Sequence, residues 1–494
     1  MSEHTEQQHR PQPGIGIALI PVFLAVAILV GGIGILQYPA ELMLVFAAVV
    51  FVIFAVIYGA KWDNIILEMG EKIKRALPAI LILLSIGIII GSWMISGTIP
   101  LMVYYGLQLI NPAHLFVLAF IVTAITSTFT GTSWGSAGTI GVALISIAQT
   151  MDVSLAITAG AVVSGAYFGD KLSPLSDTTN MSAIAAGSDL YEHIRHMLYT
   201  AVPSSILALI VFWIAGTTIP TSSGQIAEVE SMTASLENLF SLNPLLLVPP
   251  LIVLIGSMMK KPPLIILFVS SLTALLLAWI LQGAAFSNIF ASVVSGFTTD
   301  MLPENVELSE DLSSLLNRGG LYSMYNATFF IFCAFFFASA LEASNVLRVL
   351  LEGIIQKLRS TGSIVFTTLV SGFVVINGTS NALVTYFLIK DIYGDVFRKH
   401  RLHPVNLSRS MEDSVTITEV LMPWTVSGVF MATTLGVGNF EFLPWAVFNW
   451  GGFIFSALLA FLAPWTNNFG IRTLPEASAQ YGEPSEEEPQ SLYK

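Results

Sequence analysis

Charge and cysteine are scarce in this chain. Of its 494 residues only 11% are charged, and Cys333 is the one cysteine. One cysteine excludes a disulfide within the chain and suggests no thiolate metal cluster. Its position inside an apolar run is typical of a small hydrophobic side chain in a membrane helix. Because roughly a quarter of the residues in soluble domains are charged, the shortage of charge argues against an ordinary soluble protein.

Motifs of catalysis and nucleotide binding are also missing. The chain has no phosphate-binding glycine-rich loop, no nucleophile elbow and no nucleic-acid-binding motif. It also lacks the histidine and cysteine spacing of a zinc site. We therefore expect a protein that is not an enzyme, has no resident cofactor and binds no nucleic acid.

Long apolar runs make up most of the chain instead. Apolar residues account for 54% of the sequence, and the mean hydropathy is +0.76. Runs such as 14–36 have the roughly 20 residues that an α-helix needs to cross a bilayer, and they lack the alternation of a membrane β-strand. The sequence predicts an all-α integral membrane protein with about 12–14 transmembrane helices. The candidate crossings are 14–36, 41–60, 77–97, 112–130, 131–150, 154–180, 198–216, 243–259, 263–282, 322–343, 363–378, 380–396, 404–437 and 442–464.

The basic residues indicate how the helices are oriented. Cytoplasmic loops retain lysine and arginine, and the segments 61–75, 260–261 and 398–401 fall on one side if the amino terminus is cytoplasmic. Only Arg318 then lies clearly outside. We expect a multi-pass protein with both termini in the cytoplasm and the lipid bilayer as its main partner.

The two halves of the chain resemble each other. Each contains Gly-Thr-Ser at the end of an apolar run, and Gly131 matches Gly378 at a separation of 247 residues. Downstream, Gly169-Asp170 in the first half and Glu412-Asp413 in the second occupy similar places, each in an interrupted helix. With an odd number of crossings in each half, the halves form inverted-topology repeats with broken or re-entrant helices at the midplane. Chance matching of small residues stays open as an alternative.

This pattern predicts five segments. They are a cytoplasmic N-terminal tail (1–13), a first membrane repeat (14–216), an extracytoplasmic connecting loop (217–242), a second membrane repeat (243–464) and an acidic cytoplasmic C-terminal tail (465–494).

Acidic side chains inside the predicted spans are the leading functional candidates. A charge in hydrocarbon costs several kcal/mol, so such acids normally face a cavity or a partner. The neighbouring hydroxyl and amide groups are oxygen ligands that suit a small hard cation such as Na+. A carboxylate can hold either a proton or a metal cation, and alternating access turns that competition into exchange. The candidate Na+ ligands are Asp170, Asp177, Glu412 and Asp413.

Each acid also has a plainer interpretation. Asp170 could pair with the adjacent Lys171, and Asp177 could cap a helix. The neighbouring acids of the second half point about 100° apart on a helix, so one of them could pair with Arg409 instead of facing a site.

The two Gly-Thr-Ser sites are the second group of candidates. Their small residues allow helices to pack closely or to unwind. Asn377 and Asn381 flank the second site and favour a polar function for it. Trp134 beside the first site is expected to be a cavity wall or an interfacial anchor. The candidate residues of the two sites are Thr132, Ser133, Asn377, Thr379, Ser380 and Asn381.

Three stretches carry a family resemblance. At "GTSWGSAGTIG", "FGDKLSPLSDTTN" and "LSRSMEDSVTITEVLMPW" the chain resembles the bacterial NhaC-type sodium/proton antiporters, over about residues 14–464. The resemblance implies a secondary transporter of the bacterial cytoplasmic (inner) membrane, in a superfamily with two inverted repeats. That group also includes similar proteins that exchange malate for lactate or carry amino acids. The residues that it points to are Asp170, Ser173, Ser176, Asp177, Thr178, Asn180, Arg409, Glu412, Asp413 and Thr416.

Sodium/proton exchange is therefore the expected function. The alternative is ion-coupled transport of a small organic anion or an amino acid, in which Arg409 or Lys171 would meet a substrate carboxylate. An ion channel would need a continuous pore, which broken helices and repeats disfavour. The expected transported partners are Na+ and H+, and a homodimer stays open.

Overall fold

Helices make up nearly all the regular structure of the protein. The computed structural model describes residues 13–219, 223–259, 261–302, 310–355, 360–466 and 468–474. Within these ranges, extended pairing is limited to two isolated bridges, Phe297 with Arg318 and Leu402 with Thr473. The prediction of an all-α fold is confirmed. Nearly all of the predicted N-terminal tail, most of the C-terminal tail and a few residues of the connecting loop lie outside the described residues.

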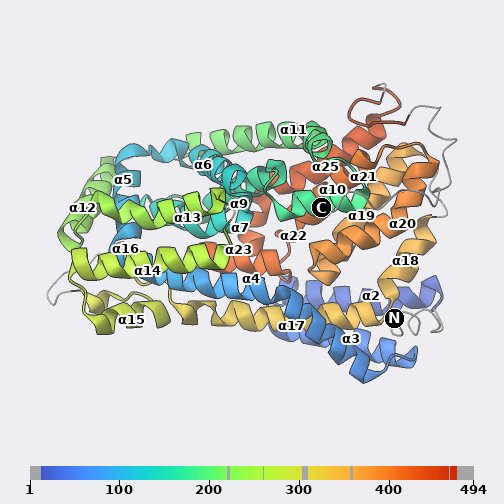
Figure 1. Ribbon diagram of the computed structural model, residues 1–494, viewed down its shortest axis with the longest axis horizontal. Coiled ribbons are helices and arrows are strands. Elements are labelled where there is room, and N and C mark those ends of the chain that lie inside the picture. The colour runs from blue at the N-terminus through green and yellow to red at the C-terminus, as the bar shows by residue number, and fades with distance from the viewer. Residues whose placement is uncertain are drawn as a thin grey trace, which may run out of the picture.

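Seven helical segments among the described residues are long and apolar enough to cross a membrane. They are α2 (Ile15–Val26) with η1 (Ala27–Ile35), α3 (Ala40–Ile57), η2 (Pro112–His114) with α6 (Leu115–Thr130), α11 (Leu190–Thr217), α14 (Pro263–Gln282), η6 (Leu321–Met324) with α17 (Tyr325–Ala343), and α19 (Thr361–Thr379). The longest helices run side by side along the long axis of the molecule (Figure 1).

Three sharply bent helix pairs raise the number of spans to as many as ten. The pairs are the end of α4 (Trp62–Ser96) with α5 (Thr98–Leu109), bent by 72°, the end of α12 (Ser223–Leu239) with η4 and α13 (Pro244–Met258), bent by 98°, and α23 (Val426–Leu435) with α24 (Asn439–Phe442) and η8 (Leu443–Trp445), bent by 88°. The sequence predicts about 12–14 transmembrane helices. That larger number includes helices that are too short, too interrupted or too charged to be counted here as membrane spans by length and apolar composition.

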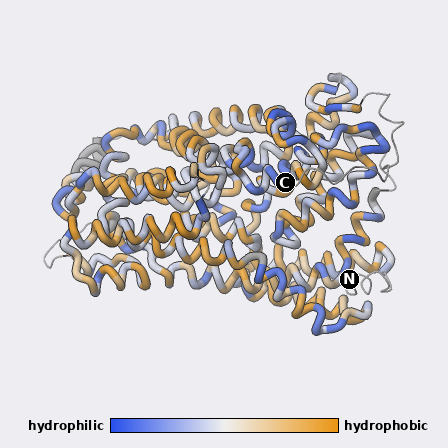
Figure 2. The backbone as a smooth tube through the Cα atoms, in the orientation of Figure 1, coloured by the Kyte–Doolittle hydropathy of each residue, from blue (hydrophilic) through white to orange (hydrophobic). Residues whose placement is uncertain are grey.

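The remaining helices are mostly interior or terminal pieces. They are α7 (Ser133–Ser136), η3 (Ala137–Gly141), α8 (Val142–Thr150), α9 (Leu155–Leu172), α10 (Asp177–Ala186), α15 (Phe286–Val294), η5 (Thr299–Met301), α16 (Glu310–Leu316), α18 (Val346–Ile355), α20 (Ala382–Lys399), α21 (Pro404–Met411), η7 (Glu412–Thr416), α22 (Ile417–Glu419) and α25 (Val447–Leu462). Apolar residues dominate the long outer helices, whereas polar residues gather toward the centre and the right-hand end (Figure 2).

Two stretches of the chain repeat the same succession of helix ends. Capping residues recur 249 positions apart, and so do the left-handed residues that end helices. The pairs are Asn111 with Ser360, Gly131 with Ser380, Thr132 with Asn381, Ser154 with His403, Ser176 with Thr425, and Gly187 with Gly436. Residues 111–188 therefore correspond to residues 360–437.

This register corrects the one expected from the sequence. The match of Gly131 with Gly378 is two residues out, because Gly378 lies inside the last turn of α19 and Ser380 is the left-handed residue that follows that helix. The acidic pair Glu412-Asp413 is consequently not the counterpart of Gly169-Asp170. The two repeats enter the centre from opposite ends of the molecule, α6 from the end that holds α5 and α19 from the end that holds α18 (Figure 1).

Close packing of α9 on α6 positions the first repeat. A methyl group added at Gly165 would lie 2.2 Å from the carbonyl oxygen of Phe120, and one added at Gly169 would lie 2.3 Å from that of Ala124. Glycine at both positions lets the two backbones touch, as in other small-residue contacts of membrane helices.

We expect Gly169→Ala to destabilise the protein, because overpacking of such a contact costs about 1–3 kcal/mol. The melting temperature of the purified protein in detergent measures this loss. The matched control is Gly70→Ala, where an added methyl group has nothing within 4 Å. Equal melting temperatures for the two variants would show that the α6–α9 contact tolerates the extra group.

Candidate functional site

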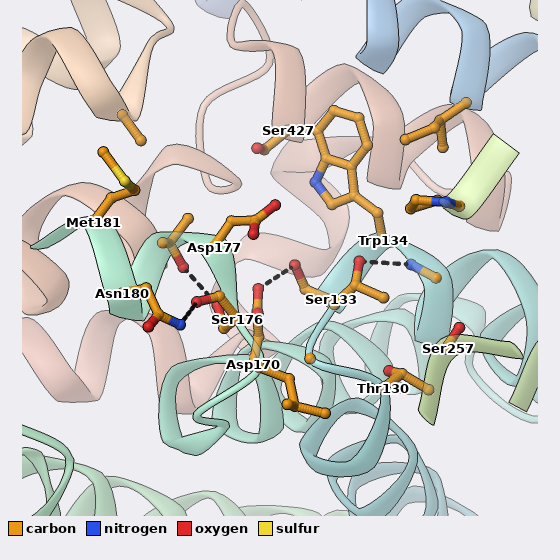
Figure 3. A pocket seen from close by; sticks show the side chains of 18 of the residues that line it. Thr130, Ser133, Trp134, Asp170, Ser176, Asp177, Asn180, Met181, Ser257 and Ser427 are labelled. Atoms are coloured by element: carbon orange, nitrogen blue, oxygen red, sulfur yellow. Dashed lines mark hydrogen bonds between the residues drawn. The ribbon is translucent and has the colours of Figure 1, made fainter. Parts of the chain in front are cut away.

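A cavity of about 840 Å³ lies where the interrupted helices of the two repeats meet. Among the described residues that line it, the charged ones are three carboxylates, Asp170, Asp177 and Glu419, and one amine, Lys261. The cavity lining therefore has an excess of negative charge, which suits a cation. Figure 3 shows the carboxylates of Asp170 and Asp177 directed into this space, with Trp134 and Ser427 facing them.

The first wall of the cavity is the break between α9 and α10. Residues 173–176, with Pro174 at their centre, are not helical, and α10 restarts with Ser176 as its N-cap, which accepts the backbone N–H of Thr179 at 3.5 Å. The hydroxyl of Ser173 donates to the carbonyl of Thr128 at 2.8 Å and so ties the break to α6. The polar residues of this segment thus fold it into a joint beside the cavity.

Asp170 lies in the last turn of α9, on the cavity side of this joint. Its side chain is buried, and its carboxylate accepts a hydrogen bond from the hydroxyl of Ser133 at 2.8 Å (Figure 3). Pairing with Lys171 was one interpretation from sequence, but Lys171 pairs elsewhere. Asp170 is therefore a carboxylate with a hydroxyl partner and an open cavity beside it.

Asp177 occupies the first turn of α10 and is exposed to the cavity. The capping role falls to its neighbour Ser176, so the carboxylate of Asp177 is left to the cavity, where the positive end of the helix favours it. The hydroxyls of Thr178 and Ser176 are 3.0 Å apart. Asn180 donates to the carbonyls of Pro174 and Ser176, at 3.0 and 2.7 Å, and closes the turn.

The acids of η7 are fully buried and do not line the cavity. Asp413 forms an ion pair with Lys171 of α9, and the same oxygen accepts a hydrogen bond from Thr200 of α11 at 3.1 Å. The guanidinium Nε of Arg409 lies 3.8 Å from the other oxygen. Asp413 therefore joins the two repeats.

Glu412 is separated from the cavity by one side chain. Its Oε1 accepts a hydrogen bond from the hydroxyl of Tyr386 at 3.3 Å, and that hydroxyl lies 2.5 Å from the Oγ1 of Thr416. Tyr386 itself lines the cavity. The four acids predicted as Na+ ligands therefore do not converge, and no group of three or more His, Cys, Asp or Glu side chains in the described ranges could hold a metal ion together.

The Gly-Thr-Ser sites act as helix ends around the cavity. Thr132 caps α7 by accepting the N–H of Gly135 at 3.3 Å, and Asn381 caps α20 by accepting the N–H of Val384 at 3.0 Å. Both line the cavity, together with Ser133 and Ser380. The other two candidates do not line it.

Those two candidates are used in local hydrogen bonds. Thr379 pairs with the hydroxyl of Thr385 at 3.1 Å. Asn377 donates to the carbonyl of Phe373 at 2.7 Å, and its own backbone carbonyl accepts the indole N–H of Trp424 at 3.1 Å. Both residues therefore stabilise the end of α19.

Sequence reasoning missed Glu419, which ends α22 and lines the cavity. Its counterpart 249 residues earlier is Asp170. The signal was present in the sequence, but the register taken from the Gly-Thr-Ser motif paired Asp170 with the wrong acids.

A pair of stacked aromatic rings borders the cavity. The rings of Trp134 and Phe430 are 4.2 Å apart between centroids, and Phe430 is fully buried. A second hollow of about 410 Å³ lies beyond them, lined by Arg318 and by the end of α23. Ile86 and Ile90, one turn apart on α4, line the first and the second hollow respectively. Trp134 lines the first hollow, and Phe430 lies on α23, whose end lines the second.

A helical membrane protein with interrupted helices around an acidic central cavity has the architecture of a secondary transporter. The family model described as "Na+/H+ antiporter family" matches residues 165–463. An uncharacterized Na(+)/H(+) antiporter of Haemophilus influenzae is 43% identical over 89% of this chain and 94% of its own length. The Na(+)/H(+) antiporter NhaC of Alkalihalophilus pseudofirmus is 34% identical over 88% and 92%.

A further relative, the malate-2H(+)/Na(+)-lactate antiporter of Bacillus subtilis, is 32% identical over 88% of this chain and 91% of its own length. The chain belongs to the Na+/H+ antiporter family, and the NhaC-type resemblance is confirmed.

The buried ion pair between Lys171 and Asp413 generates a stability prediction. We expect Lys171→Met to lower the free energy of unfolding by about 3–5 kcal/mol, because it leaves Asp413 as a buried carboxylate without its main partner. The double variant Lys171→Met/Asp413→Leu should recover most of the loss. Melting temperatures in detergent measure both effects, and a single variant as stable as the wild type would contradict this role.

Proposed function

We propose that the protein exchanges Na+ for H+ by competition of the two ions for carboxylates of the central cavity. The observation that carries the proposal is Asp170, a buried carboxylate at a helix break, with Ser133 as its hydroxyl partner and a cavity of negative excess charge beside it. Membership of the Na+/H+ antiporter family supports the choice of ions.

The chemistry follows from the surroundings of Asp170. Ionised, its carboxylate offers oxygen ligands to Na+ together with nearby hydroxyl groups of the helix ends, the donor type that hard cations prefer. Protonated, the same group is neutral and tolerates the interior of the membrane far better than a bare carboxylate. Because only one ion occupies the carboxylate at a time, opening the cavity alternately to the two sides exchanges one ion for the other.

The arrangement supports Na+/H+ exchange better than transport of an organic anion. Arg409 and Lys171, the two cations predicted from the sequence to meet a substrate carboxylate, do not line the cavity, and both are directed at Asp413. Lys261 does line it, but it faces three carboxylates in the same lining. The malate-lactate relative shows that the family accommodates such substrates, so the assay of function includes them.

Everted membrane vesicles test the proposal. We expect Na+ alone, without malate, lactate or an amino acid, to dissipate a preformed pH gradient reported by a fluorescent dye. Asp170→Asn should abolish this response because an amide cannot exchange a proton for a cation, whereas Asp391→Asn on the exposed face of α20 should leave it unchanged. A response that requires an organic solute, or full activity in Asp170→Asn, would overturn the proposal.

We further infer that the protein lies in the bacterial inner membrane with both termini in the cytoplasm. This places α12 outside and the end of α20 inside, at opposite ends of the molecule (Figure 1). In a background without Cys333, single cysteines at Ser231 and Lys399, both exposed, should differ in intact cells. A membrane-impermeant maleimide should label Ser231→Cys and spare Lys399→Cys until the cells are lysed. The reverse pattern would invert the orientation.

A further inference from the structure

Glu419 occupies the same place in the second repeat as Asp170 in the first. Asp170 lies three residues before the non-helical link 173–176, which leads to the N-cap Ser176 of α10. Glu419 is the last residue of α22 and precedes the link 420–425, which leads to the N-cap Thr425 of α23. Both side chains line the central cavity. Each repeat thus presents one carboxylate at its own helix break.

Packing contacts confirm the register that relates the two acids. In the first repeat, a methyl group added at Gly165 would lie 2.2 Å from the hydroxyl oxygen of Thr123. At the equivalent positions of the second repeat, a methyl group added at Gly372 would lie 2.2 Å from the hydroxyl oxygen of Ser414. The same helix contact is made in both repeats, with the glycine on one helix in the first and on the other helix in the second. The correspondence therefore holds within α9 and η7 as well as at the caps.

The surroundings of the two carboxylates are similar. Asp170 accepts a hydrogen bond from Ser133, and Glu419 interacts with the hydroxyl and the backbone amide of Ser427. Ser427 lines the cavity and faces the acids of the first repeat (Figure 3). Each acid therefore has a serine of the cavity wall as its partner.

A buried tyrosine connects the two acids. Tyr167 on α9 is 2% exposed and within electrostatic reach of both Glu419 and Asp170. Its hydroxyl has no hydrogen bond of normal geometry in the structure. The side chains of Ser427 and Trp134, which line the cavity, lie within reach of this hydroxyl, so the tyrosine borders the surroundings of both acids.

The other acids near the centre are ion-paired, outside the cavity lining or exposed. Asp413 is ion-paired with Lys171, Glu412 lies behind Tyr386, and Asp177 is exposed. Within the described part of the chain, the ion pairs include neither Asp170 nor Glu419. Of the carboxylates that line the cavity, Asp170 is buried and Glu419 is partly buried, and both are open to a cation that enters the cavity.

We propose that Glu419 is a second cation-binding carboxylate of the central cavity, the counterpart in the second repeat of Asp170 in the first. The inference rests on the proposed function, since that function supplies the ion. One carboxylate from each inverted repeat gives the ion equivalent ligands when the cavity opens to either side, because the repeats exchange roles during alternating access.

The test is Na+ binding to the purified full-length protein, measured by titration calorimetry and by the thermal stabilisation that a bound ligand produces. We expect Glu419→Gln to weaken Na+ binding at least about tenfold, a loss of about 1.4 kcal/mol, and Asp170→Asn to do the same. Glu419→Asp, which keeps the charge on a shorter side chain, should bind Na+ with intermediate affinity. Glu441→Gln, on the exposed face of α24, is the matched control and should bind as the wild type does.

The double variant Asp170→Asn/Glu419→Gln adds a readout that a merely structural role would not give. If both carboxylates hold one ion, the two losses are not additive. Wild-type affinity in a folded Glu419→Gln protein would overturn the inference and leave Na+/H+ exchange through Asp170 intact. If Glu419→Gln does not fold, wild-type affinity in Glu419→Asp overturns it instead. Absence of Na+ binding and exchange in the wild-type protein would refute the proposed function itself.

Discussion

An ionised side chain inside a membrane protein needs a counter-charge, a hydrogen-bond donor or water, since the bilayer interior supplies none of them. The acids in the centre of this protein meet that requirement in different ways. Asp413 has a lysine from the other repeat, Glu412 has a tyrosine hydroxyl, and Asp170 and Glu419 have serine hydroxyls and a cavity. The first two have partners on neighbouring helices, although one carboxylate oxygen of each lacks a hydrogen bond. The other two line the cavity, and this position makes them available to an ion.

The helix breaks exist because of the same requirement. A helix that ends inside the membrane leaves backbone N–H and C=O groups without partners, and this chain places a capping side chain at the restarts that border the cavity. Ser176 and Thr425 accept backbone N–H groups at equivalent positions. Two further hydroxyl bonds, from Thr179 to the carbonyls of Asp170 and Lys171, satisfy the end of α9 at 3.3 and 3.1 Å. The hydroxyl groups of the segments noted in the sequence are therefore largely structural, which leaves their carboxylates for the proposed function.

Local properties of the fold could be predicted from the sequence, and long-range ones could not. The apolar runs predicted the membrane helices, and the polar residues after Asp170 predicted a helix break, which the structure has at residues 173–176. The partner of Lys171 was not predictable, because Asp413 lies 242 residues away and only tertiary packing brings the two together. Glu419 was missed for a related reason: a repeat of low identity fixes its register through helix ends and packing contacts, which one motif of small residues cannot define.

The stack of Trp134 on Phe430 has equivalents in the other repeat, and they differ in chemistry. The equivalent residues are Leu383 and Met181, both of which line the open cavity, with Leu383 46% exposed. An aromatic pair contributes about 0.5–1.5 kcal/mol beyond its buried area, and the aliphatic pair lacks this contribution. The contact between Trp134 and Phe430 is therefore more strongly held than the contact that replaces it in the other repeat. Two halves that share a backbone plan thus differ in side-chain chemistry at equivalent positions, so the molecule is asymmetric where its repeats meet.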